Sequence, residues 1–95
     1  MMEELIREFN SLGIKDMGEV TQLNELKGDF INLECWLPNG QTAKILDDSK
    51  IYYGTELCKE NSERCYGLAA DENQIIVYEY GDGGSQAELV LWKRR

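Results

Sequence analysis

Apolar residues near the start of the chain recur with the period of an α-helix. Five of them share one stripe, at spacings close to 3.6 residues per turn: Met2, Leu5, Ile6, Phe9 and Leu12. Gly13 follows the stripe and suits the left-handed conformation in which many helices end. This pattern predicts a helix over residues 2–12.

The next segment fits two interpretations. Asp16, with Glu19 three residues later, resembles a capping box and predicts a second helix over residues 17–26. The alternation of valine, threonine and glutamine over residues 19–23 favours a strand instead. The sequence alone leaves both open.

From residue 29 onward the pattern is that of β-strands. Residues 29–37 and 41–47 flank a turn, in which Pro38 has no amide hydrogen to offer a two-residue Asn-Gly loop. A three-residue loop over Pro38, Asn39 and Gly40 is therefore favoured. Its register separates apolar from polar pairs: Leu33 opposite Ile45, Cys35 opposite Ala43, Glu34 opposite Lys44, and Trp36 opposite Thr42.

A second hairpin is predicted near the end, from residues 74–80 and 86–92 around Gly81, Asp82, Gly83 and Gly84. With residues 82–84 as its loop, Ile75 faces Leu91 and Val77 faces Leu89. The reverse face is apolar as well, so a helix on one side leaves the other to be covered by a curled sheet or by another chain. Between the hairpins we expect a short strand over residues 50–53, ended by Gly54, and an irregular segment over residues 55–73.

These elements predict one α+β domain over residues 1–95. One or two N-terminal helices would pack on a four- to five-stranded antiparallel sheet made of hairpins. We find no internal repeat or linker, and no apolar run near the roughly 20 residues that span a bilayer. The acidic start is unlike a signal peptide, so we expect a cytoplasmic protein that binds no membrane.

The charge of the chain changes the functional picture. There are 18 acidic and 10 basic residues, a net charge of −8, and without the last three residues 18 acids face 7 bases, or −11. Such a field repels phosphate backbones, so direct binding of nucleic acid is not expected. It favours a basic protein partner, although plain solubility explains the same composition.

The residue types needed for common catalytic and metal sites are missing. No histidine is present, so no Ser-His or Cys-His pair can form. Cys35, Cys58 and Cys65 match no zinc-binding spacing, and we expect thiols, with a Cys58–Cys65 disulfide as the alternative. We therefore predict no enzyme, no metal and no cofactor.

Aromatic residues interleaved with acids are the strongest candidates for a binding surface. Tyrosine and tryptophan dominate protein–protein hot spots, and here acids rather than bases flank them. The candidate partner-binding residues are Glu34, Trp36, Asp47, Asp48, Tyr78, Glu79, Tyr80, Glu88 and Trp92. The competing interpretation is that these aromatics belong to the core.

These observations favour a small acidic inhibitor that binds a basic, nucleic-acid-binding surface of a larger protein. Inhibitors of host defence from phages and mobile elements, anti-CRISPR proteins included, commonly have this size and charge, which is an analogy of class. An immunity protein or antitoxin that neutralises a basic nuclease would use the same physics. The alternatives are a homodimer through the aromatic face, or a small ligand-binding or cysteine-dependent enzyme domain.

Overall fold

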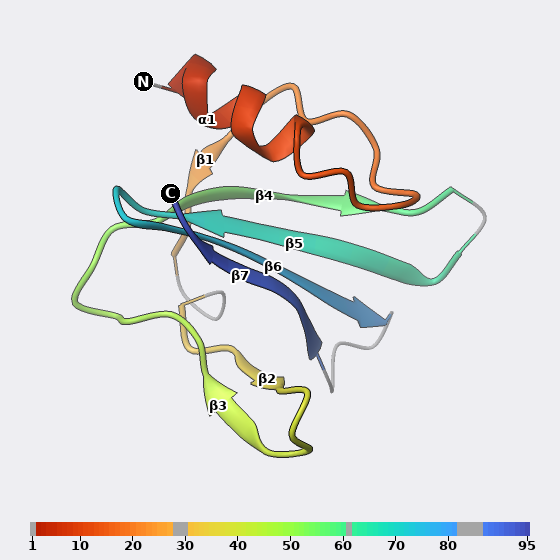
Figure 1. The fold of residues 1–95 in the computed structure, drawn as a ribbon, viewed down its shortest axis with the longest axis vertical. Helices are drawn as coiled ribbons and strands as arrows, with labels where there is room; N and C mark the ends of the chain where they lie inside the picture. Colours follow the sequence, from red (N-terminus) through yellow and green to blue (C-terminus); the bar gives the residue numbers. More distant parts are fainter. Residues whose placement is uncertain (1, 28–30, 61, 82–86) are drawn as a thin grey trace.

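One helix and one sheet make up the fold of the residues that the computed structural model describes, 2–27, 31–60, 62–81 and 87–95. The helix α1 spans Met2–Asn10. Seven strands are present: β1 (Asn24–Glu25), β2 (Glu34–Trp36), β3 (Thr42–Lys44), β4 (Tyr53–Cys58), β5 (Arg64–Ala70), β6 (Gln74–Gly81) and β7 (Ala87–Arg94). Their order in the sheet is β1-β4-β5-β6-β7-β2-β3 (Figure 1).

The predicted α+β class with a mostly antiparallel sheet is confirmed, with more strands than expected. Seven strands replace the predicted four or five, and a single N-terminal helix is described. Every neighbouring pair is antiparallel except β2 and β7, which run parallel. Through that pair the β2–β3 hairpin extends the sheet beyond β7.

Neither the predicted helix over residues 17–26 nor the alternative strand over residues 19–23 forms, and α1 ends two residues earlier than predicted. Gly13 has a φ of 70°, as expected for a helix end, but Asp16 has a φ of 65°, which does not suit an N-cap. The Asn10 side chain instead binds the backbone of Val20, donating to its carbonyl (2.9 Å) and accepting from its amide (2.7 Å). These two bonds take the place of helix or strand hydrogen bonds at residue 20.

The β2–β3 hairpin has the predicted register. Glu34 pairs with Lys44, Cys35 with Ala43, and Trp36 with Thr42, while the strands are shorter than the pattern suggests. Gly40 has a φ of 83°, as the three-residue loop requires. Leu33 and Ile45 lie beyond the paired residues and pack in the same apolar cluster.

The central β4–β5 hairpin overturns the prediction of an irregular segment over residues 55–73. Gly54 does not end a strand over residues 50–53; it lies within β4, directly opposite Ala69 of β5. A Cβ on Gly54 would lie 1.8 Å from the backbone oxygen of Leu68, so this glycine allows the two strands to approach each other. The prediction of a short strand was wrong because this glycine marks close packing instead of a turn.

The register of β6 and β7 also differs from the prediction. Val77 pairs with Leu91 and Tyr78 with Leu89, so Val90 is the extra residue of a β-bulge. The predicted pairs of Ile75 with Leu91 and Val77 with Leu89 are wrong by two residues. The predicted loop over residues 82–84 lies outside the described residues.

The chain itself covers both faces of the sheet. On one face, called the helix face, α1 and the segment over residues 12–23 pack on β5 and β6, with Leu5, Phe9, Val20, Leu68 and Val77 buried. On the other, called the loop face, apolar side chains of the segments over residues 31–35 and 45–52 pack against those of the central strands, with Cys35, Ile45, Leu46, Tyr52 and Ile76 buried. The apolar reverse face of the last hairpin therefore needs no second chain to cover its centre.

Candidate functional site

Four of the candidate residues share the helix face of the sheet. Trp36 of β2 lies beside Glu88 of β7, which lies opposite Glu79 of β6. Glu34 lies two residues before Trp36 on β2 and points to the same face. We call these residues, Glu34, Trp36, Glu79 and Glu88, the Trp36 surface.

This row of residues is buried at its β5 end and exposed on β7 and β2. Tyr66 of β5, opposite Glu79, is 5 % exposed and donates a hydrogen bond to the Lys15 carbonyl (3.0 Å). Trp36 is 40 % exposed, the side chain of Glu88 is 68 % exposed, and Glu34 is exposed. The row thus leads from the core to an exposed indole between two carboxylates.

Glu79 is neutralised by its own neighbours. Its carboxylate accepts hydrogen bonds from Arg64 Nε and from Lys59 Nζ (3.4 Å), and its side chain is 20 % exposed. The hydrogen bond from Arg64, followed by that from Lys59, lowers the pKa of Glu79. Contact with Tyr66, whose ring centre lies 4.7 Å from Lys59 Nζ, and then with Glu79 raises the pKa of Lys59. The charge of Glu79 is therefore compensated within the fold and contributes little to the binding of a partner.

Glu34 and Glu88 keep more of their charge available. The Glu88 carboxylate lies 4.0 Å from Arg64 Nη2, at the limit of an ion pair. Glu34 lies opposite Lys44, but Lys44 pairs with Asp48 instead (3.2 Å), and within the described parts of the chain Glu34 has no ion pair. The partner-facing part of the surface is therefore Glu34, Trp36 and Glu88.

Asp47 and Asp48 lie in the exposed segment between β3 and β4. Asp47 Oδ1 accepts hydrogen bonds from the amide (2.9 Å) and hydroxyl (2.7 Å) of Ser49, and the hydroxyl contact, then the amide contact, lowers its pKa. Asp47 thus closes a local turn. Asp48 forms an ion pair with Lys44, the residue opposite Glu34 in the β2–β3 hairpin.

Tyr78, Tyr80 and Trp92 lie on the loop face, away from the Trp36 surface. Tyr78 is 2 % exposed and belongs to the core of that face, stacked at 5.9 Å on the half-buried Tyr80. Burial is the largest cause of the raised pKa of both phenols. The Tyr80 hydroxyl is buried without a hydrogen-bond partner among the described residues. Only Trp92, 47 % exposed, offers an aromatic surface here.

Two of the three cysteines are joined in a disulfide, and the third is a free thiol. Cys58 and Cys65 lie directly opposite each other on β4 and β5 and form a disulfide, so the expectation of thiols at these positions is wrong. Cys35 is a buried thiol, and burial raises its pKa to about 11. Glu56 lies near both disulfide sulfurs, but sulfurs bonded to each other are not thiolate ligands for a metal.

A basic groove lies at the end of β7, where the sequence pattern predicted only an aromatic contact. It has a volume of about 510 Å³, and its lining includes Lys50, Gln74, Trp92, Lys93, Arg94 and Arg95. We call it the Trp92 groove. The run of three bases after Trp92 is visible in the sequence, but Lys50 comes from a distant segment and joins them only in the fold.

Comparisons with known proteins identify no relative of this chain. No family model matches the chain, and neither a curated protein nor a solved structure is significantly similar to it. Among the residues described, no helix has the length and apolar character needed to cross a membrane.

Proposed function

We propose that the protein is a small interaction module that inhibits a larger protein by docking its Trp36 surface on a basic, nucleic-acid-binding face. The observation that supports this most directly is the half-exposed Trp36 between Glu34 and Glu88 on one face of the sheet. An exposed indole supplies the apolar anchor of a hot spot, and the carboxylates supply complementarity to lysine and arginine.

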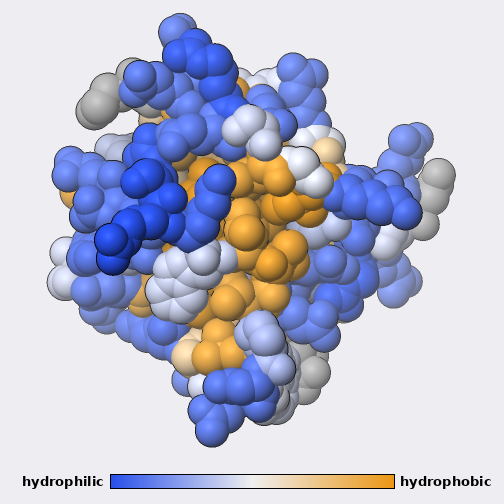
Figure 2. Space-filling view, viewed as in Figure 1, coloured by the Kyte–Doolittle hydropathy of each residue, from blue (hydrophilic) through white to orange (hydrophobic). Residues whose placement is uncertain are grey.

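The shape and charge of the molecule support the same proposal. Figure 2 shows apolar side chains gathered in the middle of one face, between α1 and the β2–β3 hairpin, with hydrophilic side chains around them. An apolar centre with a polar rim is the usual anatomy of a protein interface. The net charge of −8 would speed encounter with a basic groove, where carboxylates take the place of phosphates.

This physics fits two kinds of inhibitor. An anti-defence inhibitor of the anti-CRISPR type and an immunity protein or antitoxin against a basic nuclease would both block a nucleic-acid groove. We do not extend the proposal to a cysteine-dependent enzyme, because Cys58 and Cys65 are joined in a disulfide and Cys35 is buried with a raised pKa. A cytoplasmic location stays a prediction, and disulfides persist mainly in oxidising compartments.

The experiment has two stages, because the partner is defined only by its chemistry. The full chain is used to capture proteins from its native host, and a captured candidate is then purified and its affinity measured at low and high salt. We expect a nucleic-acid-binding protein with a basic groove, whose affinity falls with added salt and which nucleic acid displaces. A partner without a basic face, or one that binds nucleic acid and this chain simultaneously, would contradict the proposal.

Matched variants locate the interface. Trp36→Ala, Glu34→Lys and Glu88→Lys should each weaken binding by at least about tenfold. Trp92→Ala is the aromatic control, and Glu19→Lys is the charge control, an exposed acid with no ion pair among the described residues. Equal losses from the controls would rule out the Trp36 surface. If sedimentation shows a dimer that Trp36→Ala dissociates, the surface binds a second copy of the chain instead.

A further inference from the structure

The Trp92 groove has a positive charge that the rest of the molecule lacks. All four charged residues in its lining are cations, although acids outnumber bases 18 to 10 in the chain. Arg95 is neutralised by Glu8 of α1. Lys93 lies opposite Ile75 and points to the helix face, where its charge acts on Glu8. Lys50 and Arg94 have no ion pair within the described segments, so they are free to meet an anion.

Hydrogen bonds hold the Trp92 ring in place at the groove. Its Nε1 donates to Gln74 Oε1 (2.7 Å). Gln74 Nε2 in turn donates to Asp71 Oδ2 (3.2 Å) and to the hydroxyl of Tyr52 (3.4 Å), a residue only 1 % exposed. The edge of the indole is thereby connected to the core, while almost half of the residue stays open to the groove. A fixed aromatic ring of this kind can stack on a planar ligand without a further ordering cost.

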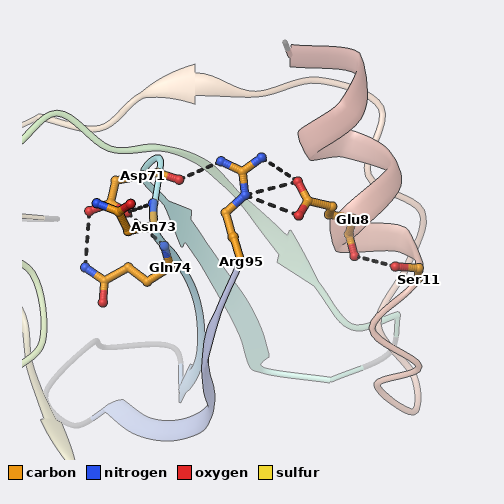
Figure 3. A network of polar contacts seen from close by, with 6 residues as sticks. All are labelled: Glu8, Ser11, Asp71, Asn73, Gln74 and Arg95. Atoms are coloured by element: carbon orange, nitrogen blue, oxygen red, sulfur yellow. Dashed lines mark hydrogen bonds and ion pairs between the residues drawn. The ribbon is translucent and has the colours of Figure 1, made fainter.

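Arg95 joins the neighbouring part of the groove to α1 and to the β5–β6 turn, as Figure 3 shows. Its Nε donates to the Glu8 carboxylate (3.1 Å), and its Nη1 donates to the Asp71 carbonyl (2.7 Å). Its backbone amide donates to the Asn73 carbonyl (3.0 Å). The Asp71 carboxylate accepts hydrogen bonds from the amides of Asn73 and Gln74, so this acid beside the groove is already occupied.

We propose that the Trp92 groove binds a nucleoside phosphate. Arg94 and Lys50 would hold the phosphate oxygens, and Trp92, on the same face of β7 as Arg94, would stack on the base. The groove volume of about 510 Å³ falls within the range typical of small-molecule sites. An extended nucleic acid is disfavoured, because it would run from these cations into the field of a chain with net charge −8.

The test uses the two tryptophans separately. In a Trp36→Phe variant of the full chain, indole fluorescence reports on Trp92 alone. ATP at low salt should quench it saturably at millimolar concentration or below, and adenosine should bind at least about tenfold more weakly. In the matched Trp92→Phe variant, which leaves only Trp36, ATP should give no saturable change. Absence of saturable quenching of Trp92 would overturn the proposal.

Charge variants test the phosphate contacts, and competing ligands test the stacking role of Trp92 and the preference for a small ligand. Arg94→Gln and Lys50→Gln should weaken ATP binding at least about fivefold each, whereas Lys15→Gln, an exposed cation outside the groove, should not. Equal binding of inorganic pyrophosphate and ATP would overturn the stacking role of Trp92. Tighter binding of a single-stranded oligonucleotide than of ATP would overturn the preference for a small ligand. Amide chemical shifts that move at β7 with ATP would locate the site independently.

Discussion

The ring of Tyr78 lies against the bare backbone of Gly67 on the neighbouring strand. The two residues are directly opposite each other in β5 and β6, and a Cβ on residue 67 would lie 2.1 Å from both Cε2 and Cζ of that ring. Tyr78 is 2 % exposed, so the ring has little room to move. Gly67→Ala should therefore lower the free energy of unfolding by about 1–3 kcal/mol, measured by urea denaturation.

The control for this substitution is Gly18→Ala. A Cβ at residue 18 meets no atom within 4 Å, and no positive φ is found there. The same chemical change should leave the urea midpoint unchanged or raise it slightly, because alanine restricts the unfolded chain. Equal effects at both positions would contradict the close contact between Gly67 and Tyr78.

Sequence patterns predicted those parts of the fold that local chemistry determines. The β2–β3 register followed from Pro38 and Gly40, which fix the loop, and the structure confirms each predicted pair within the strands. The β4–β5 hairpin was missed because Gly54 is typical of a turn, whereas here it lies within β4 and allows a close contact with β5. The β6–β7 register was missed in two steps. Tyr80 already pairs one residue away from the predicted register, with Ala87, and the bulge at Val90 shifts the pairs beyond it by one more.

The candidate site was predictable to a similar extent. The alternation of side chains along β2 and β3 is enough to place Glu34 and Trp36 on one face. The burial of Tyr78 was not predictable, since it depends on the segments over residues 31–35 and 45–52 packing against an apolar face. The Trp92 groove depends on the approach of Lys50 to β7, a tertiary contact that no local pattern contains.

The disulfide between Cys58 and Cys65 should make the stability of the chain sensitive to reduction. It joins two residues separated by 7 positions, and closing so short a loop stabilises a protein by about 2 kcal/mol in the chain-entropy account. A thiol reductant should lower the urea midpoint of the wild-type protein. The same reductant should have no effect on a Cys58→Ser/Cys65→Ser variant, whose midpoint should match that of the reduced protein.

The buried thiol of Cys35 is an internal control for the accessibility of the cysteines to alkylating reagents. Its thiol is fully buried, with a pKa raised to about 11, so alkylating reagents should modify it only in the unfolded protein. Mass spectrometry of the native, unreduced chain should show no alkylated cysteine. After reduction under native conditions, Cys58 and Cys65 should react first. Rapid alkylation of Cys35 in the folded protein would contradict its position in the core.

Glu79 should make stability depend on pH in the acid range. Its pKa is lowered from the ordinary value of 4.5, so the charged form is favoured by folding. That stabilisation is fully present above pH 4.5 and is lost as the pH falls through the lower pKa of the folded state. Glu79→Gln should lower stability by about 1 kcal/mol at neutral pH, allowing for solvent screening. The difference from wild type should shrink below pH 4.5.

The matched control is Glu19→Gln, which removes an exposed acid without an ion pair in the described part of the chain. Its unfolding free energy should follow the wild-type curve over the same pH range. A difference between wild type and Glu79→Gln that stays constant down to the acid limit would show that the Glu79 charge does not stabilise the fold.

The ion pair between Arg95 and Glu8 should couple the end of β7 to α1. The two residues are 87 positions apart, and the hydrogen bond to Arg95 is the largest cause of the lowered pKa of Glu8. Because the Glu8 side chain is 40 % exposed, solvent screening limits the coupling to about 0.5–1 kcal/mol. A double-mutant cycle of Glu8→Gln and Arg95→Gln, read by urea denaturation, should give that value. Glu3→Gln with Arg95→Gln is the control cycle and should be additive, since Glu3 is exposed and no hydrogen bond or ion pair joins it to Arg95 in the described residues. Additivity in both cycles would mean that α1 is held on the sheet by its apolar stripe alone, with Leu5 and Phe9 sufficient to dock it.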